Sequence, residues 1–153
     1  MVHLYGPGGI NPSSRPLDVA CTQLGVYEEG RNRGPQVDVY VAFAGRNPDD
    51  ECPWCCAFVV WCCWQAGVEV RKTASCKRFT LLNADRRIAE PEVGCIGVHL
   101  KPDGRGHIVF IEGLGNRLST VEGNTNAAGS REGDRVARQV RAQAYFNGGF
   151  FSV

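Results

Sequence analysis

The sequence has no run of apolar residues that is long enough to cross a membrane. A transmembrane helix needs roughly 18 consecutive apolar residues, and the longest apolar stretch runs only from Cys55 to Trp64. The N-terminus also lacks the basic start and apolar core of a signal peptide. We therefore expect no membrane insertion, and synthesis in the cytoplasm.

The chain also lacks an excess of charge of either sign. It has 17 Lys and Arg against 16 Asp and Glu, a net charge of +1. Nucleic-acid-binding domains usually carry a strongly basic surface, so we expect no nucleic-acid partner. Four arginines near the C-terminus could form a local basic patch, but we interpret them as solvated surface: Arg131, Arg135, Arg138 and Arg141. The length of 153 residues and the hydrophobic content of 43% indicate one globular domain.

A dispersed set of cysteines is likewise missing. The chain has eight cysteines, and five of them lie between Cys52 and Cys63. Disulfide scaffolds distribute their cysteines over several loops, whereas buried reduced thiols behave as small apolar side chains. No second CxxC or HxxxH pair is present to complete a zinc site. We therefore expect mostly reduced thiols, no metal and no cofactor.

The pattern along the chain predicts helices first and an antiparallel sheet afterwards. Residues 1–15 indicate an irregular arm, and residues 16–153 a single domain. Apolar spacing and Gly or Pro boundaries predict helices over 16–24, 35–44, 54–66 and 76–84. Short β-branched runs predict strands over 93–100, 107–112 and 118–122, and residues 135–145 alternate before an aromatic tail. The fold class is therefore α+β.

Cys55 is the candidate nucleophile. It follows Pro53 and Trp54 and falls in the first turn of the strongest predicted helix. Unpaired backbone N–H groups and the positive end of the helix dipole favour a thiolate at that position, and the thiolate is the attacking species in cysteine catalysis. Cys56 points about 100° away around the helix, so both thiols cannot face the same base.

His107 is the candidate base. If the runs 106–113 and 117–124 form a hairpin turning at Gly115 and Asn116, His107 lies opposite Asn124 and Val109 opposite Glu122. His107, Glu122 and Asn124 then project from the same face. An acceptor in that position holds the far nitrogen of the imidazole and fixes its tautomer. His99 has no comparable partner, and we interpret it as structural.

Three motifs carry a resemblance to a known family. PWCCAFVVW at 53–61, GHIVFIEG at 106–113 and STVEGNTN at 119–126 resemble the CHAP branch of the NlpC-type, papain-like peptidoglycan hydrolases. The block Gly34–Asp38 with Tyr40 and Gly45 resembles one subgroup of phage and bacterial cell-wall hydrolases. The resemblance covers about residues 25–130.

The resemblance implies a papain-like core that cleaves an amide bond of the bacterial cell wall. It assigns Cys55 as nucleophile, His107 as general base, Glu122 as the orienting residue and Asn124 as the polar fourth residue. It implies an N-acetylmuramoyl-L-alanine amidase or a peptide endopeptidase, a monomer of the phage endolysin type that reaches peptidoglycan after release. Cys56 departs from the small residue that relatives often have after the nucleophile.

Other interpretations stay open at this point. The protein could be an interbacterial toxin that is injected to degrade the cell wall, or a wall-binding module without activity. Cys52 and Cys55 also match a thiol-redox CxxC motif. Asp49 and Asp50 could bind calcium, although a solvated acidic loop is the simpler interpretation. We expect Trp54, beside the nucleophile, to bind substrate by stacking.

Overall fold

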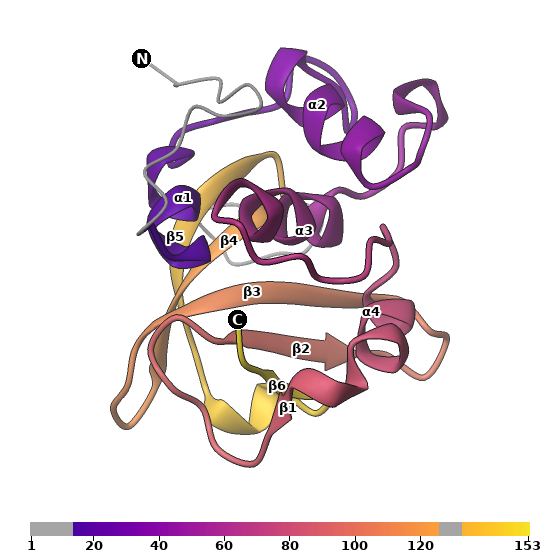
Figure 1. The fold of residues 1–153 in the computed structure, drawn as a ribbon. Helices are drawn as coiled ribbons and strands as arrows, with labels where there is room; N and C mark the ends of the chain where they lie inside the picture. The colour runs from indigo at the N-terminus through magenta and orange to yellow at the C-terminus, as the bar shows by residue number, and fades with distance from the viewer. Residues whose placement is uncertain (1–13, 126–132) are drawn as a thin grey trace.

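The computed structural model describes residues 14–125 and 133–153, and these residues form an α+β fold (Figure 1). Within them, four α-helices precede or flank a six-stranded sheet with the order β1-β6-β2-β3-β4-β5. Every neighbouring pair of strands in this sheet is antiparallel. The predicted α+β class with an antiparallel sheet is therefore confirmed.

The helices lie where the sequence placed them, within about two residues at most ends. They are α1 (Pro16–Thr22), α2 (Pro35–Phe43), α3 (Cys55–Gln65) and α4 (Cys76–Leu82). Proline begins α1 and α2, where its missing N–H would have no helical partner. Ser75 caps α4, since its hydroxyl accepts a hydrogen bond from the Arg78 backbone N–H at 3.2 Å. No helix in the described parts of the chain is long and apolar enough to cross a bilayer.

The sheet confirms three predicted strands, contains a fourth within the alternating run 135–145, and adds two that were not predicted. Its strands are β1 (Arg87–Ile88), β2 (Ile96–Leu100), β3 (Gly106–Gly113), β4 (Leu118–Thr125), β5 (Arg135–Arg141) and β6 (Gly149–Phe151). The sequence did not predict β1 or β6. The short β6 belongs to the aromatic tail and pairs between β1 and β2, a long-range contact that local patterns do not reveal.

The β3–β4 pairing has the register expected from the sequence. Phe110 lies opposite Val121 and Ile111 opposite Thr120. The same register would pair His107 with Asn124, but the β3–β4 partners run from Phe110 and Val121 to Gly113 and Ser119. The β3–β4 register shifts between Ile111 and Gly113, and the β4–β5 register shifts between Glu122 and Thr125. The second shift changes the position of Asn124, as described below.

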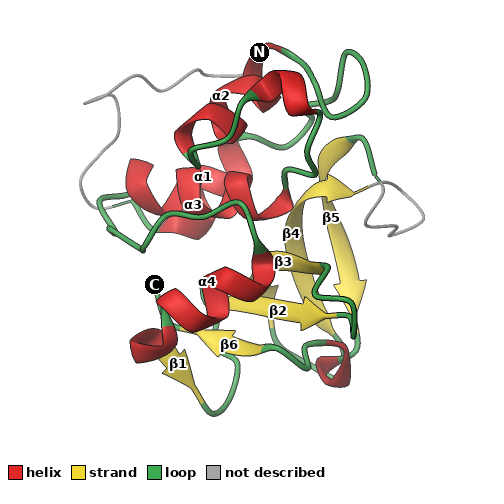
Figure 2. Ribbon diagram, turned by 90° about the vertical axis from the view of Figure 1, so that its right-hand side faces the viewer, coloured by secondary structure: helices red, strands yellow, loops and turns green. Residues whose placement is uncertain are grey.

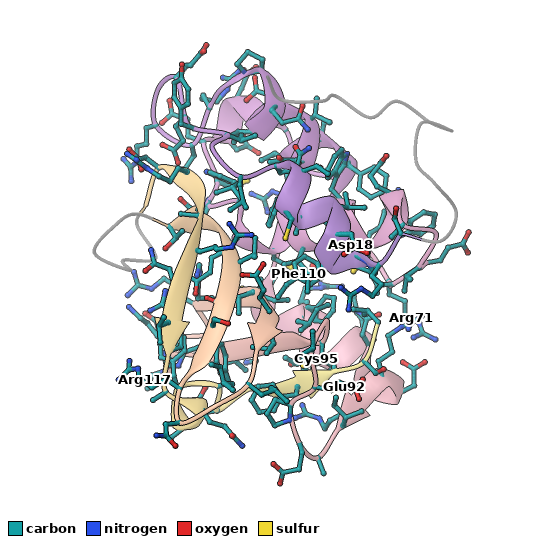
Figure 3. All side chains as sticks on the ribbon, turned by 90° about the vertical axis from the view of Figure 1, so that its left-hand side faces the viewer. Asp18, Arg71, Glu92, Cys95, Phe110 and Arg117 are labelled. Atoms are coloured by element: carbon teal, nitrogen blue, oxygen red, sulfur yellow. The ribbon has the colours of Figure 1, made fainter. Side chains whose placement is uncertain are left out.

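Helix α3 forms the centre of the core. It packs against α1 and α2 on one side and against β3 and β4 on the other (Figure 1). Every side chain from Cys55 to Cys63 is buried, which is typical of a helix covered all round. Phe110 of β3 lies in the middle of the molecule (Figure 3), and its ring meets Phe58 of α3 at a centroid distance of 6.4 Å.

Alternate residues of β3 serve two different cores. Ile108 and Phe110 belong to the main core with the helices, whereas Val109 and Ile111 belong to a smaller cluster with Phe146 and Phe150. This alternation is the period of two expected of a strand buried on both faces. Figure 2 shows α1, α2 and α3 gathered together, with α4 beside β2. The arrangement fixes β3 firmly against α3.

Candidate active site

Cys55 is the first residue of α3, directly after the N-cap residue Trp54. The first helical hydrogen bond runs from the Phe58 N–H to the Trp54 carbonyl at 2.9 Å. The N–H groups of Cys55 and the next two residues therefore precede the helical ladder and point toward the start of the helix. Cys55 is 5% exposed and lines a solvent-accessible groove of about 540 Å³. The thiol thus combines a helix N-terminus with access from solution.

His107 lies next to Cys55, near the start of β3, and is completely buried. Its Nε2 lies 2.8 Å from Oε1 of Glu122. Its Nδ1 has no hydrogen bond of standard geometry to a described residue, yet the Cys55 thiol is close enough to influence its pKa. The imidazole therefore offers one nitrogen to a carboxylate and leaves the other for the thiol.

Three side chains hold the Glu122 carboxylate in the interior. Arg141 of β5 donates to both carboxylate oxygens, at 2.9 Å from Nε and 2.6 Å from Nη2. The Thr120 hydroxyl donates to Oε2 at 2.6 Å. Burial would raise the pKa of Glu122, but the hydrogen bonds from Arg141 and His107 outweigh it and lower the pKa to about 2. Glu122 is therefore a fixed negative charge under the imidazole.

The Glu122 carboxylate makes the imidazole of His107 more basic than that of an ordinary histidine. Burial would lower the pKa of His107, but the neighbouring Cys55 thiol and the hydrogen bond with Glu122 raise it to about 9. A carboxylate at the far nitrogen orients the imidazole and stabilises the imidazolium. The chain thus contains a histidine that is suited to accept a proton from a neighbouring thiol.

The Cys55 thiol has a second sulfur beside it. Cys76, the first residue of α4, places its Sγ 3.7 Å from Sγ of Cys55. The hydrogen bond with Cys76 and then burial raise the pKa of Cys55 well above its usual value, while His107 acts in the opposite direction. Gly106 permits this approach, because a Cβ there would lie 3.0 Å from Cβ of Cys76. The Cys76 contact and burial therefore oppose a thiolate at Cys55, and His107 favours one.

Asn124 lies at an irregular point of β4. It lies within the register shift of β4 and has a left-handed backbone with φ of 55°. It is 2% exposed, and its Oδ1 has no hydrogen-bond partner among the described residues. It lines a small cavity of about 80 Å³ together with Glu28 and Pro53. The structure brings Cys55, His107 and Glu122 together and leaves Asn124 outside their hydrogen-bond network.

Trp54 does not fit the substrate-stacking role that we expected. Its side chain is fully buried, and its ring stacks on Tyr40 at 5.8 Å with an interplanar angle of 25°. Its Nε1 donates a hydrogen bond to Oε1 of Glu28 at 2.8 Å. The expectation failed because an aromatic residue beside a nucleophile can equally be a packing anchor. Trp54 instead fixes the chain immediately before Cys55.

Cys56 faces away from the histidine, as its position on the helix predicted. It is fully buried, and its thiol donates to the Thr73 carbonyl at 3.3 Å. The two adjacent cysteines thus have the same residue type and different surroundings. Cys56 is a matched control for any experiment on Cys55.

Sequence reasoning missed the role of Arg141. We expected the four C-terminal arginines to lie on the solvated surface. Arg135 and Arg138 do so: both are exposed, and they pair with Asp134 and Glu112, respectively. Arg141 instead points inward to Glu122, and Arg131 lies outside the described residues. The available signal was the strand period: Thr120 and Glu122 share a face of β4, and β5 is the neighbouring strand.

The acidic loop and the cysteines were the two features of the sequence that suggested metal or redox chemistry. Within residues 14–125 and 133–153, no group of three or more metal-binding side chains is present. The acidic loop faces arginines instead, since Asp49 accepts from Arg33 at 2.9 Å and Asp50 lies 3.9 Å from Arg46. All eight cysteines lie in the described residues, and none of them forms a disulfide bond.

Comparisons with known proteins add no family. No protein-family model matches this sequence, and neither a curated protein nor a solved structure shows significant similarity to it. The function must therefore be inferred from the chemistry of the site.

Proposed function

We propose that this protein is a papain-like cysteine hydrolase that cleaves an amide bond in bacterial peptidoglycan. The observation that carries the proposal is the buried His107–Glu122 pair beside a thiol at the start of a helix. A nucleophile, a base and a group that orients the base are the three parts of nucleophilic acyl transfer. The choice of peptidoglycan as the substrate rests on the resemblance of the motifs around Cys55 and His107 to the CHAP family.

In the proposed first step, His107 accepts the Cys55 proton at Nδ1, and the thiolate attacks the carbonyl carbon of the scissile amide. Glu122 and Arg141 keep the imidazolium in place through Nε2. The tetrahedral intermediate collapses as the C–N bond breaks, and the imidazolium protonates the leaving amine. The product is a thioester between Cys55 and the acyl part of the substrate.

In the second step, water hydrolyses this thioester. His107 takes a proton from the water, hydroxide adds to the thioester carbonyl, and the C–S bond breaks to release the acid. The Cys55 sulfur leaves as a thiolate and recovers the proton from His107. The N–H groups at the start of α3 would stabilise the oxyanion in both steps, since they precede the helical hydrogen bonds.

The raised pKa of Cys55 has a mechanistic consequence. Because the hydrogen bond with Cys76 contributes most to it, a substrate that enters the groove and displaces this contact would favour proton transfer to His107. The nucleophile would then be activated when the substrate is present.

A phage endolysin fits this activity, and an injected interbacterial toxin would use the same chemistry. Both would act as amidases or peptide endopeptidases on the cell wall. The two settings differ in delivery and not in the site, so the activity itself is the first property to test.

The test measures loss of turbidity of purified peptidoglycan sacculi, with mass spectrometry of the released fragments. Wild type and Cys56→Ala are expected to solubilise sacculi, and Cys55→Ala is expected to be at least about a thousandfold slower, because it lacks the attacking group. The fragment masses identify the bond. Cleavage by Cys55→Ala at the wild-type rate, or no cleavage of any sacculus type by folded wild type, would show that the proposal is wrong.

A further inference from the structure

The groove beside Cys55 has a strongly one-sided charge. Four basic side chains line it and are exposed: Arg46, Lys72, Arg78 and Arg105. None of its lining residues is Asp or Glu. The chain as a whole carries a net charge of only +1, so the lining of the groove is far more basic than the chain as a whole. A groove lined by positive charges attracts anionic ligands and raises their local concentration.

The four basic side chains differ in the contacts that their charged groups already make. Arg105 pairs with Asp103 at 2.7 Å, and the Lys72 ammonium lies 3.7 Å from the centre of the Phe43 ring. Arg46 has only a long contact of 3.9 Å with Asp50. The Arg78 side chain forms no ion pair with any residue that the structure describes. Arg78 and Arg46 are therefore the groups best placed to bind an anion.

We infer that this groove recognises a carboxylate-bearing peptide next to the scissile amide, with Arg78 and Arg46 as specificity-determining residues. The inference rests on the proposed function, since it concerns the same site. Stem peptides of peptidoglycan carry carboxylates, and these are free in some cell walls and amidated in others. A guanidinium matches a carboxylate with two parallel hydrogen bonds, and a neutral amide cannot replace that contact. The protein would thus prefer walls whose stem peptides are not amidated.

The first test measures binding without turnover. Full-length Cys55→Ala is titrated calorimetrically with a soluble stem tetrapeptide that has free carboxylates, and with its carboxamide twin. The free acid is expected to bind at least about tenfold more tightly. Adding Arg78→Gln should remove most of this difference. Adding Arg117→Gln should leave it unchanged, because Arg117 is exposed and does not line the groove.

The second test measures turnover on sacculi with free or amidated stem carboxylates. A higher kcat/KM on the free form, lost in Arg78→Gln, would support the inference. Equal cleavage of both forms would overturn it and leave the hydrolase proposal intact. Selective binding of the free peptide without cleavage of any sacculus would retain the anion site and overturn the hydrolase proposal. Equal binding of the two peptides, or tighter binding of glycerol phosphate than of the free peptide, would overturn a carboxylate site.

Discussion

His99 and His107 face each other across β2 and β3, but the regions around them differ. His99 is half-buried, its ring stacks on Tyr145 at 4.2 Å, and its Nδ1 lies 2.7 Å from the Tyr145 carbonyl oxygen. His107 is fully buried and bonded to a carboxylate that Arg141 neutralises. One histidine is held by a neutral aromatic cluster, and the other by a buried network of charges.

The difference shows that position on the sheet does not by itself make a catalytic histidine. A buried carboxylate costs several kcal/mol unless it is paired and hydrogen-bonded. Glu122 meets that requirement through Arg141, Thr120 and His107. A charged network maintained at this cost in the interior is more often found at functional sites than elsewhere. Three predictions test the comparison, in order of decreasing effect.

The largest effect is expected from replacing the two histidines in turn. His107→Ala should reduce the rate of peptidoglycan cleavage by about a thousandfold, because general base catalysis typically contributes 10²–10⁴. The cleavage rate of His99→Ala should remain within a few-fold of that of wild type, because His99 contacts Tyr145 and not the thiol. Initial rates on sacculi measure both. Equal losses in the two variants would remove the distinction between the regions.

Glu122→Gln should change both the stability and its dependence on pH. The pKa of Glu122 is about 2 instead of its usual 4.5. A carboxylate with a lowered pKa stabilises the fold at any pH above its usual pKa. This stabilisation is lost as the pH falls from 4.5 toward 2. The shift corresponds to about 3 kcal/mol. Urea unfolding at several pH values should therefore show a weaker acid dependence in the variant.

A matched variant sharpens that prediction. Asp85→Asn removes a carboxylate that pairs with Arg71 at 2.8 Å on the surface, where both side chains are exposed. Such pairs contribute little to stability, so this variant should follow the wild-type curve. A Glu122→Gln protein with the acid dependence of wild type would mean that Glu122 is not the buried charge described here.

The smallest effect is expected at Cys76. The hydrogen bond with Cys76 is the largest cause of the raised pKa of Cys55, so Cys76→Ala should lower that pKa. The pH midpoint for alkylation of Cys55 by iodoacetamide should then move to lower pH, as followed by peptide mass spectrometry. Cys56→Ala serves as the control, because its thiol bonds to the Thr73 carbonyl. An unchanged or higher midpoint in Cys76→Ala would contradict the assignment.

Local patterns in the sequence determined much of the fold. Pro16, Pro35 and Gly67 mark helix ends because proline lacks an N–H donor and glycine adopts positive φ, here 81° at Gly67. The period of two placed β3 and β4 and gave their register. The order of Cys55, His107 and Glu122 on a helix and two strands followed from the same patterns, and the structure joins the last two by a hydrogen bond.

Only the tertiary structure decided which neighbours these residues have. Arg141 and Cys76 lie 19 and 21 residues from the groups that they contact, so these contacts depend on how the strands and helices pack in the folded chain. The burial of Trp54 and the displacement of Asn124 depend likewise on packing and on a shift in strand register. The physical reason is range: hydrogen bonding and side-chain period act over a few residues, whereas burial and charge pairing are set by the whole folded chain.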